Sequence, residues 1–330
     1  MVSILITGGT GFIGISLVKK LYELGHNLRL LIRESSDPTP FEALQNIEYI
    51  IGDVRDIDSI NNAVKEIDII YHLAAFTGIW AKSNSIFYDI NVRGTENVAK
   101  IALKNNIKLY YISSFTALGP TSSEPVGEIY ENEKFCMEYE KSKCEAKKLI
   151  KEYIPKGLKV TTFYPGIVYG PGDFNIFGGM LYDIMRGKIF PLGLCPGKGQ
   201  SIACFSYLND VVDTLTNIIG NDDLSGEDFI LGGENVKFID YLNLIAKISR
   251  NKRARKIPMW IAKTYAWLLE IKASITKKKP PLSRAAINAI KYHRSYSSKK
   301  AIEKLNYKIT PLREGLEETI KWYRNYSESN

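Results

Sequence analysis

A tyrosine and a lysine four positions apart, Tyr139 and Lys143, are the residues of this sequence best suited to proton transfer. They fall in segment 138–153, whose pattern predicts a helix, and this spacing places both side chains on one face. A free tyrosine titrates near about 10. A nearby ammonium stabilises the phenolate, so the phenol can exchange a proton with a carbonyl or alcohol oxygen. Ser113 and Ser114 end a predicted strand 25 residues earlier, where parallel sheets bind ligands, and a serine there can hydrogen-bond the same oxygen.

A glycine-rich turn, Thr7-Gly8-Gly9-Thr10-Gly11-Phe12-Ile13-Gly14, joins the first predicted strand to the first predicted helix. In such a turn the first glycine permits the tight bend, the second lets the backbone approach a pyrophosphate, and the third allows close packing of helix on strand. The helix start then holds the phosphate charge. Because the glycines stand in the strand–turn–helix context that this mechanism requires, they predict a dinucleotide site. Its expected contacts in the turn are Thr7, Gly8, Gly11, Phe12, Ile13 and Gly14.

The residue after the second predicted strand discriminates between the two nicotinamide dinucleotides. NAD enzymes place an Asp or Glu there for the ribose 2′-hydroxyl, whereas an Arg suits a 2′-phosphate. This sequence has Arg33 at that point, followed by Glu34. Arg33 favours NADP(H), and Glu34 leaves NAD(H) open if the strand ends one residue later.

Strands and helices that alternate along the first half must position these groups. The predicted strands are 2–7, 28–32, 47–51, 68–73, 108–113 and 159–164, and the predicted helices are 12–24, 56–65, 83–105 and 138–153. Alternation of this kind predicts right-handed βαβ units, and continuously apolar strands are typical of a sheet buried on both faces. The expected fold class is therefore α/β, with a Rossmann-type doubly wound parallel sheet.

The second half is less regular, and glycine and proline cluster after residue 170. Helical patterns return at 208–219, 239–249, 259–275, 284–292 and 312–326. We predict a dinucleotide-binding domain over 1–170, with further elements of it within 200–235. A smaller, mostly helical and discontinuous substrate-binding lobe is predicted over 171–330.

Taken together, the motifs resemble the extended short-chain dehydrogenase/reductases of the NAD-dependent epimerase/dehydratase family. The resemblance covers nearly the whole chain. Besides the glycine turn it rests on Ser113-Ser114-x-x-x-x-Gly119, on Tyr139-Glu-Lys-Ser-Lys143 and on segments 52–56, 72–75, 91–97 and 164–172, which follow in the family's order.

The resemblance implies roles for particular residues. Tyr139 is the expected general acid/base, Lys143 tunes it and binds the nicotinamide ribose, and Ser114 orients the substrate oxygen. Asn91 is a supporting residue. Further cofactor contacts are implied for Asp53, Val54, Leu73, Ala74, Ala75, Pro165, Gly166 and Val168. A homodimer through the helices of 83–105 and 138–153 is implied as well.

Three features of the sequence indicate which members of the family it resembles most. Dehydratases commonly place Asp-Glu after the catalytic hydroxyl, but Phe115-Thr116 follows Ser114 here. Sugar-nucleotide enzymes often carry an Arg in the stretch that corresponds to 199–205, which has none here. Arg186, Lys188 or a residue elsewhere would have to hold a diphosphate. The order of motifs in the C-terminal third resembles the dihydroflavonol-reductase-like and 3β-hydroxysteroid-dehydrogenase-like members.

We therefore expect an NADP(H)-dependent oxidoreductase that interconverts a carbonyl and an alcohol on a small, fairly apolar substrate. An NAD-dependent nucleotide-sugar 4-epimerase is the first alternative. A non-catalytic dinucleotide-binding subunit is the second, although such a protein is expected to have lost Ser114, Tyr139 or Lys143.

The composition of the 330 residues limits other functions. Four cysteines without a C-x-x-C pair and three histidines predict no metal site. The net charge of +8 comes without any nucleic-acid-binding signature, so no nucleic-acid partner is expected. Reduced thiols and the absence of a signal-peptide pattern favour a cytoplasmic location.

The segment 259–275 is apolar nearly all round and is flanked by basic clusters. A helix at a membrane surface has such flanks, whereas apolar residues on every side favour burial. We predict that this helix is buried in the substrate lobe, and contact with a membrane surface is the less favoured interpretation.

Overall fold

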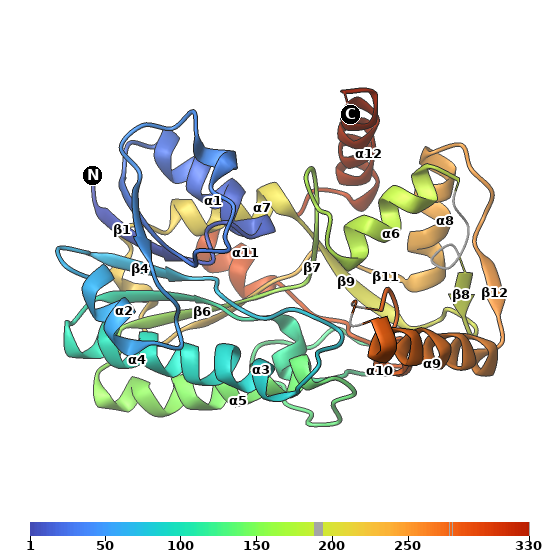
Figure 1. The fold of residues 1–330 in the computed structure, drawn as a ribbon, viewed down its shortest axis with the longest axis horizontal. Coiled ribbons are helices and arrows are strands. Elements are labelled where there is room, and N and C mark those ends of the chain that lie inside the picture. The colour runs from blue at the N-terminus through green and yellow to red at the C-terminus, as the bar shows by residue number, and fades with distance from the viewer. Residues whose placement is uncertain (188–193, 277, 279, 330) are drawn as a thin grey trace.

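A seven-stranded parallel sheet forms the centre of the described residues, which are 1–187, 194–276, 278 and 280–329 of the computed structural model (Figure 1). From edge to edge its strands are β10 (Asp228–Leu231), β6 (Val160–Pro165), β5 (Lys108–Ile112), β4 (Ile69–His72), β1 (Ser3–Thr7), β2 (Asn27–Ile32) and β3 (Glu48–Ile51). The strand order reverses between β1 and β4, which is where doubly wound sheets bind their ligands. The predicted Rossmann-type sheet is confirmed.

Helices cover both faces of this sheet (Figure 1). One layer contains α1 (Phe12–Glu23), α7 (Leu208–Asn217) and α11 (Lys299–Leu305), and the other contains α2 (Ile57–Ala63), α4 (Thr95–Lys104) and α5 (Glu138–Tyr153). Leu17 of α1 and Leu215 of α7 are buried in the first layer, and Val98 of α4 and Ile150 of α5 in the second. Burial on both faces explains why the strands are continuously apolar.

The helix predicted over 83–105 runs from Ser85 to Lys104 and changes its winding on the way. It consists of α3 (Ser85–Tyr88), the π-helical stretch η2 (Asp89–Gly94) and α4. The hydroxyl of Thr95 donates to the backbone oxygen of Asn91 at 2.7 Å within this stretch. The predicted helix is therefore present, but its residues Asp89–Gly94 are wound as a π-helix. π-Helical turns are common at functional sites.

The C-terminal lobe adds two small sheets and five helices to the described residues. The sheets are β11 (Glu234–Lys237), β9 (Ile202–Tyr207) and β7 (Ile167–Tyr169), and β12 (Arg255–Ile257) with β8 (Leu194–Pro196). The helices are α6 (Ile176–Met185), α8 (Phe238–Ile248), α9 (Met259–Thr276), α10 (Arg284–Ala289) and α12 (Leu312–Ser329), and short 3₁₀ turns are η1 (Thr39–Phe41), η3 (Phe115–Leu118), η4 (Ile154–Lys156) and η5 (Asp222–Leu224). The sequence patterns gave no sign of the small sheets. A domain boundary at residue 170 stays a prediction, although β10 and α7 pack with the N-terminal part.

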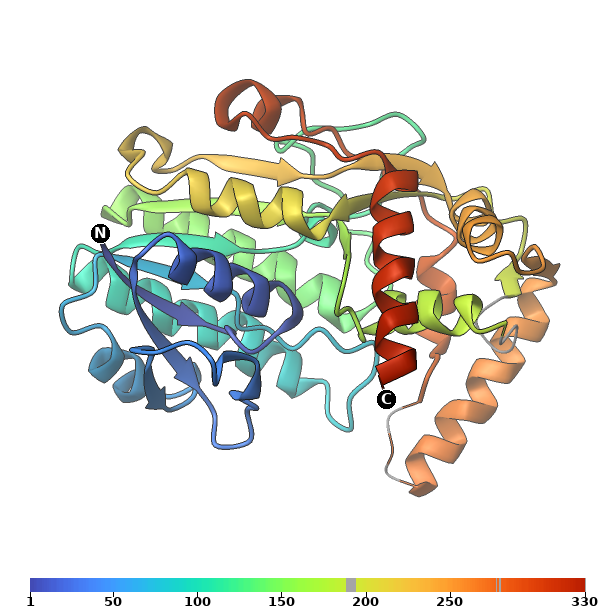
Figure 2. The ribbon, with the colours of Figure 1, turned by 90° about the horizontal axis from the view of Figure 1, so that it is seen from above.

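Helix α9 lies along the outer edge of the molecule (orange in Figure 2). Its buried residues are Ala262, Ala266 and Ala273, which face α10 and its neighbours, whereas Trp260 and Leu268 are exposed. The prediction that this segment is buried was therefore wrong. The helix packs against the lobe through its alanines, and most of its large apolar side chains are exposed to solvent. No helix in the described part of the chain is long and apolar enough to cross a bilayer.

Candidate active site

The glycine turn has the geometry that a dinucleotide needs. Gly8 has a φ of +75°, and a Cβ there would lie 2.6 Å from the backbone nitrogen of Ala74. A Cβ at Gly14 would lie 2.3 Å from the Gly8 oxygen. Only glycine therefore lets α1 and the chain after β4 come this close to the turn. Gly11 packs less tightly, with 3.3 Å from its would-be Cβ to the Gly8 oxygen.

The start of α1 is open to an anion. No side chain caps this helix, whose N-cap residue is Gly11. The first-turn N–H groups, including those of Phe12 and Ile13, therefore remain available to phosphate oxygens, and the helix dipole favours negative charge there. This cradle fits a dinucleotide pyrophosphate.

A cavity of about 710 Å³ runs from the glycine turn past the ends of the central strands into the C-terminal lobe. Its lining brings together seventeen of the eighteen predicted site residues: Gly8, Gly11, Phe12, Ile13, Gly14, Arg33, Asp53, Val54, Leu73, Ala74, Ala75, Ser114, Tyr139, Lys143, Pro165, Gly166 and Val168. Thr7 is the exception. It is fully buried and acts on the site only through His72 and the chain after β4.

The end of the cavity beside β2 carries charges of both signs. Arg33 and Ser36 line it, and Glu34 is not among the described lining residues. Asp53 accepts two side-chain hydrogen bonds from Arg55, at 3.0 and 2.8 Å. Hydrogen bonding to Arg55 is the main reason that the pKa of Asp53 is lowered, so this residue is an anion at neutral pH.

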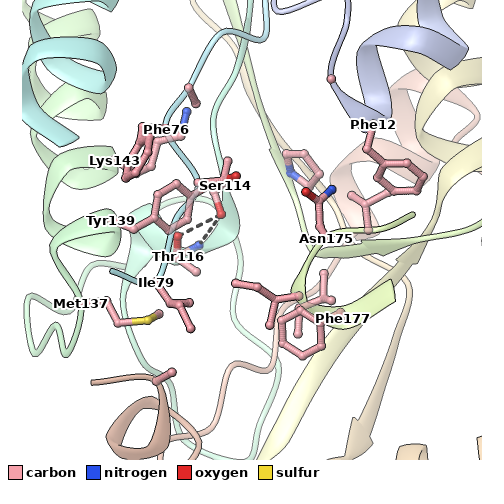
Figure 3. Close-up of a pocket in the computed structure, with 18 of the residues that line it drawn as sticks. Phe12, Phe76, Ile79, Ser114, Thr116, Met137, Tyr139, Lys143, Asn175 and Phe177 are labelled. Carbon is pink, nitrogen blue, oxygen red and sulfur yellow. Dashed lines mark hydrogen bonds between the residues drawn. The ribbon is translucent and has the colours of Figure 1, made fainter. Parts of the chain in front are cut away.

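The predicted catalytic residues lie together on one wall of the cavity (Figure 3). The Ser114 hydroxyl oxygen accepts hydrogen bonds from the Thr116 backbone N–H at 3.3 Å and from the Thr116 hydroxyl at 2.9 Å. With its acceptor sites engaged, Ser114 can donate its own proton to a bound oxygen. Thr116 was not among the predicted site residues, and its only sequence signal was a hydroxyl residue two positions after the serine.

Lys143 is buried next to Tyr139. Its residue exposure is only 2%, and its ammonium lies 3.4 Å from the Ile112 backbone oxygen and 5.1 Å from the centre of the Tyr111 ring. Burial lowers the pKa of Lys143, and the nearby Tyr139 partly opposes that effect. No carboxylate in the described chain forms an ion pair with this ammonium, so its charge is available to stabilise the Tyr139 phenolate.

Asn91 connects the catalytic helix to the chain beside the cofactor groove. Its side-chain oxygen accepts from the Phe76 N–H at 2.7 Å, and its nitrogen donates to the Phe76 oxygen at 3.1 Å and to the Ser142 hydroxyl at 2.9 Å. Ser142 lies between Tyr139 and Lys143 on α5, and Phe76 lines the cavity. Asn91 is therefore a positioning residue, in keeping with the supporting place that the resemblance implied.

His72, at the end of β4, links this strand to β1 and α4 through its ring nitrogens. One ring nitrogen lies 2.7 Å from the Thr7 hydroxyl, and the other lies 3.0 Å from the Thr95 hydroxyl. Burial, with a smaller contribution from the charge of Lys143, lowers the pKa of His72 to about 3. The imidazole is neutral at physiological pH and fixes the ends of β1 and β4 against α4 without exchanging protons.

A buried ion pair fixes the start of α5 next to Tyr139. The Glu140 carboxylate pairs with the Arg294 guanidinium and also accepts from the backbone N–H groups of Cys136, at 2.8 Å, and Met137, at 3.2 Å. Glu140 is 1% exposed. Arg294 comes from the C-terminal lobe and lines the cavity. This contact ties the catalytic helix to the lobe, and no sequence pattern predicted the pairing.

The lobe end of the cavity is mainly apolar. Its lining includes Phe177, Met180, Phe238, Ile257, Leu282 and Ile287. Among the described residues, Arg33, Lys143 and Arg294 are the arginine and lysine residues of the lining. Arg186 is exposed, stacks on Tyr182 and lies outside the lining, and Lys188 falls outside the described residues.

One titratable group in the lobe end escaped the sequence analysis. Asp173 is 2% exposed and lines the cavity. Burial raises its pKa to about 6, against the opposing effect of hydrogen bonds from Asn175 and Gly178. Because an isolated Asp in a Gly-rich loop is common, no local signal distinguished it.

Comparison with known proteins identifies the family. The family model for the NAD dependent epimerase/dehydratase family matches residues 4–232, and the chain belongs to that family of nicotinamide-dependent enzymes. It is 26% identical to a putative dihydroflavonol 4-reductase of Synechocystis, over 97% of this chain and 94% of that protein. It is 25% identical to sterol demethylase protein B of Methylococcus capsulatus, over 97% of this chain and 98% of that protein.

Solved structures agree on the fold. The crystal structure of gox2253 superposes with a TM-score of 0.82 at 29% identity and covers 99% of both chains. A UDP-glucuronic acid 4-epimerase from Bacillus cereus, solved with NAD, gives a TM-score of 0.75 at 20% identity and covers 98% of this chain and 99% of that one. Proteins named as a reductase and as an epimerase thus share this architecture, and the chemistry of this site has to discriminate between the two reactions.

Proposed function

We propose that the protein catalyses NADP(H)-dependent interconversion of a carbonyl and an alcohol on a small apolar substrate. The observation that carries the proposal is the position of Ser114, Tyr139 and Lys143 at the junction of a dinucleotide groove and an apolar pocket. The guanidinium at the pocket end, Arg294, is already paired with Glu140. A substrate diphosphate would find no free cation among the described residues of that end.

In the proposed reaction each residue of the site has a separate role. A nicotinamide bound along the groove supplies or accepts the hydride at the substrate carbon. Tyr139 gives a proton to the carbonyl oxygen during reduction and takes it back during oxidation. Ser114, whose acceptor sites are engaged by Thr116, donates a hydrogen bond to the same oxygen. Lys143 stabilises the phenolate that remains, and its burial strengthens this effect because little water screens the charge.

The preference for NADP(H) rests on the end of the cavity beside β2. Arg33 and Ser36 line it there. The Ser36 side chain accepts from the Arg33 N–H at 3.2 Å, which fixes the turn in which both lie. A guanidinium and a hydroxyl suit the oxygens of a 2′-phosphate. Glu34, the residue that left NAD(H) open, is not among the described lining residues, which supports the same preference.

The experiment is to follow absorbance of the reduced nicotinamide, with NADPH and NADH in parallel. The carbonyl panel contains sterol ketones, flavonoid ketones, simple aldehydes and UDP-keto-sugars. We expect oxidation of NADPH with an apolar carbonyl. If both cofactors bind but no carbonyl is reduced, the proposal fails and the 4-epimerase becomes the better candidate. Tightly held NAD⁺ that survives purification would point the same way.

A further inference from the structure

The outer face of α9 carries an apolar stripe, within which Thr264 is the one polar residue. Trp260, Trp267, Leu268, Ile271 and Ile275 recur at the spacing that places residues on one helix face. Their exposed fractions run from 40% for Ile271 to 76% for Ile275. Two tryptophans and three large aliphatic residues are more than a monomeric surface helix ordinarily exposes, and such a patch marks an interaction site.

Two lysines border this stripe. Lys263 and Lys272 lie at its two edges when α9 is viewed along its axis, since successive residues turn by about 100°. Lys291, which follows α10, lies beside Lys263, and its ammonium lowers the pKa of Lys263. None of the three forms an ion pair within the described part of the chain. Two ammonium groups that repel each other are stabilised by an anion placed between them.

The rest of α9 adds no exposed negative charge to this face. Glu270 is the only acidic residue in the helix, and it is bound by Arg284 through two hydrogen bonds of 2.7 and 2.6 Å. Arg253, Arg255 and Lys256 are exposed just before the helix, and Lys278 is exposed after it. The apolar stripe is therefore framed by cations on its sides and at both ends.

We propose that α9 docks on an anionic phospholipid surface. In the docked state the helix lies in the plane of the interface, with Trp260, Trp267 and Leu268 among the upper acyl chains and Lys263 and Lys272 against the headgroups. This pattern of a large apolar face between lysines is that of interfacial helices. At 18 residues the helix is about 27 Å long, and it lies on the bilayer instead of crossing it.

The docked face lies next to the cavity. Ile261, which is 40% exposed, and its neighbours Ala262 and Tyr265 line the lobe end of the cavity. One turn of α9 thus contributes both to the outer surface and to the pocket wall. If the proposed function holds, an apolar carbonyl dissolved in the bilayer would reach the site beside this turn without crossing water.

Vesicle co-sedimentation of the full-length protein, without nicotinamide or substrate, tests the docking itself. We expect the protein to bind vesicles of phosphatidylglycerol mixed with phosphatidylcholine, and not vesicles of phosphatidylcholine alone. Tryptophan emission should shift to shorter wavelength on binding. Binding should fall at least about tenfold in roughly 1 M salt, where the screening length is about 3 Å.

Helix α1 and the residue that follows it supply matched controls. Leu268 and Leu24 have the same exposed fraction of 52%. Leu268→Ser should weaken vesicle binding by about tenfold, whereas Leu24→Ser should not change it. Lys272→Glu should weaken binding similarly, and Lys19→Glu, at another exposed lysine, should have a much smaller effect.

Several results would overturn the docking proposal. These are no binding to anionic vesicles, equal binding of both vesicle types, and equal effects of Leu268→Ser and Leu24→Ser. Light scattering that shows Leu268→Ser dissociating an oligomer would mean that a second copy covers the stripe. Tyr139→Phe should bind vesicles like the wild type, so loss of the proposed reductase activity and loss of docking are separate outcomes.

Discussion

Replacing Asn91 by alanine should both destabilise the protein and slow the reaction. Asn91 is fully buried, and the substitution removes three hydrogen bonds, two to the backbone of Phe76 and one to the Ser142 hydroxyl. At about 1 kcal/mol for each bond, the free energy of unfolding should fall by about 3 kcal/mol. In a chain of 330 residues that corresponds to a melting temperature roughly 4 °C lower.

The effect on rate follows from which elements Asn91 holds. Loss of the bond to Ser142 loosens the helix segment that carries Tyr139 and Lys143, and small displacements of reacting groups cost up to about a hundredfold in rate. We expect kcat to fall by about ten- to a hundredfold, measured as nicotinamide oxidation well below the variant's melting temperature. Asn105→Ala is the control, because it removes one hydrogen bond, to the Ile101 oxygen, at the far end of α4. If Asn91→Ala loses stability but keeps the wild-type kcat, the positioning role is refuted.

Three further perturbations test other parts of the account. Arg33→Ser should raise the KM for NADPH by about ten- to a hundredfold through loss of charge-assisted bonds, with little change for NADH, and equal changes for both cofactors would contradict a 2′-phosphate contact. Glu140→Gln leaves the buried partner Arg294 without its carboxylate and should lower the free energy of unfolding in urea by about 3 kcal/mol. Glu133→Gln, in an exposed ion pair, should lower the free energy of unfolding by under about 1 kcal/mol. Similar losses in the two variants would show that the buried pair of Glu140 and Arg294 contributes no more than an exposed one. In the unfolded chain His72 binds a proton below about pH 6.5, but in the folded chain it does so only below about pH 3. Between these values the unfolded chain gains a proton that the folded chain does not, so the fold loses stability as the pH falls from about 6.5 to about 3. His72→Asn should reduce the slope of stability against pH there by up to about 1.4 kcal/mol per pH unit, and parallel curves would show that His72 titrates normally.

The dinucleotide half could be predicted from sequence because its signals are local. The glycine turn can be predicted from a few adjacent residues, since the positive φ of Gly8 and the close packing at Gly14 both require glycine. The helix predicted over 138–153 has the bounds of α5. The spacing of Tyr139 and Lys143 then sufficed to place both in the cavity.

The lobe could not be predicted to the same depth because its contacts join distant segments. Strand β9 pairs with β11, which follows it in the sequence after α7 and β10, and with β7, which precedes it before α6. The bond between Glu140 and Arg294 spans 154 positions. In α9 the apolar pattern was visible, but only the packing of Ala262 and Ala266 against the lobe decides which side faces out. A homodimer through α3–α5 remains a prediction from the resemblance.

The central claim is that this site transfers hydride between nicotinamide and an apolar carbonyl with Tyr139 as the acid. The most direct measurement incubates the protein with NADPH carrying deuterium at the transferable position and with the best carbonyl of the panel. Mass spectrometry then determines the deuterium content of the alcohol formed. We expect one deuterium in each product molecule, and a rate lowered by about a hundredfold or more in Tyr139→Phe. Alcohol without deuterium, or an undiminished rate in the Phe variant, would contradict this claim.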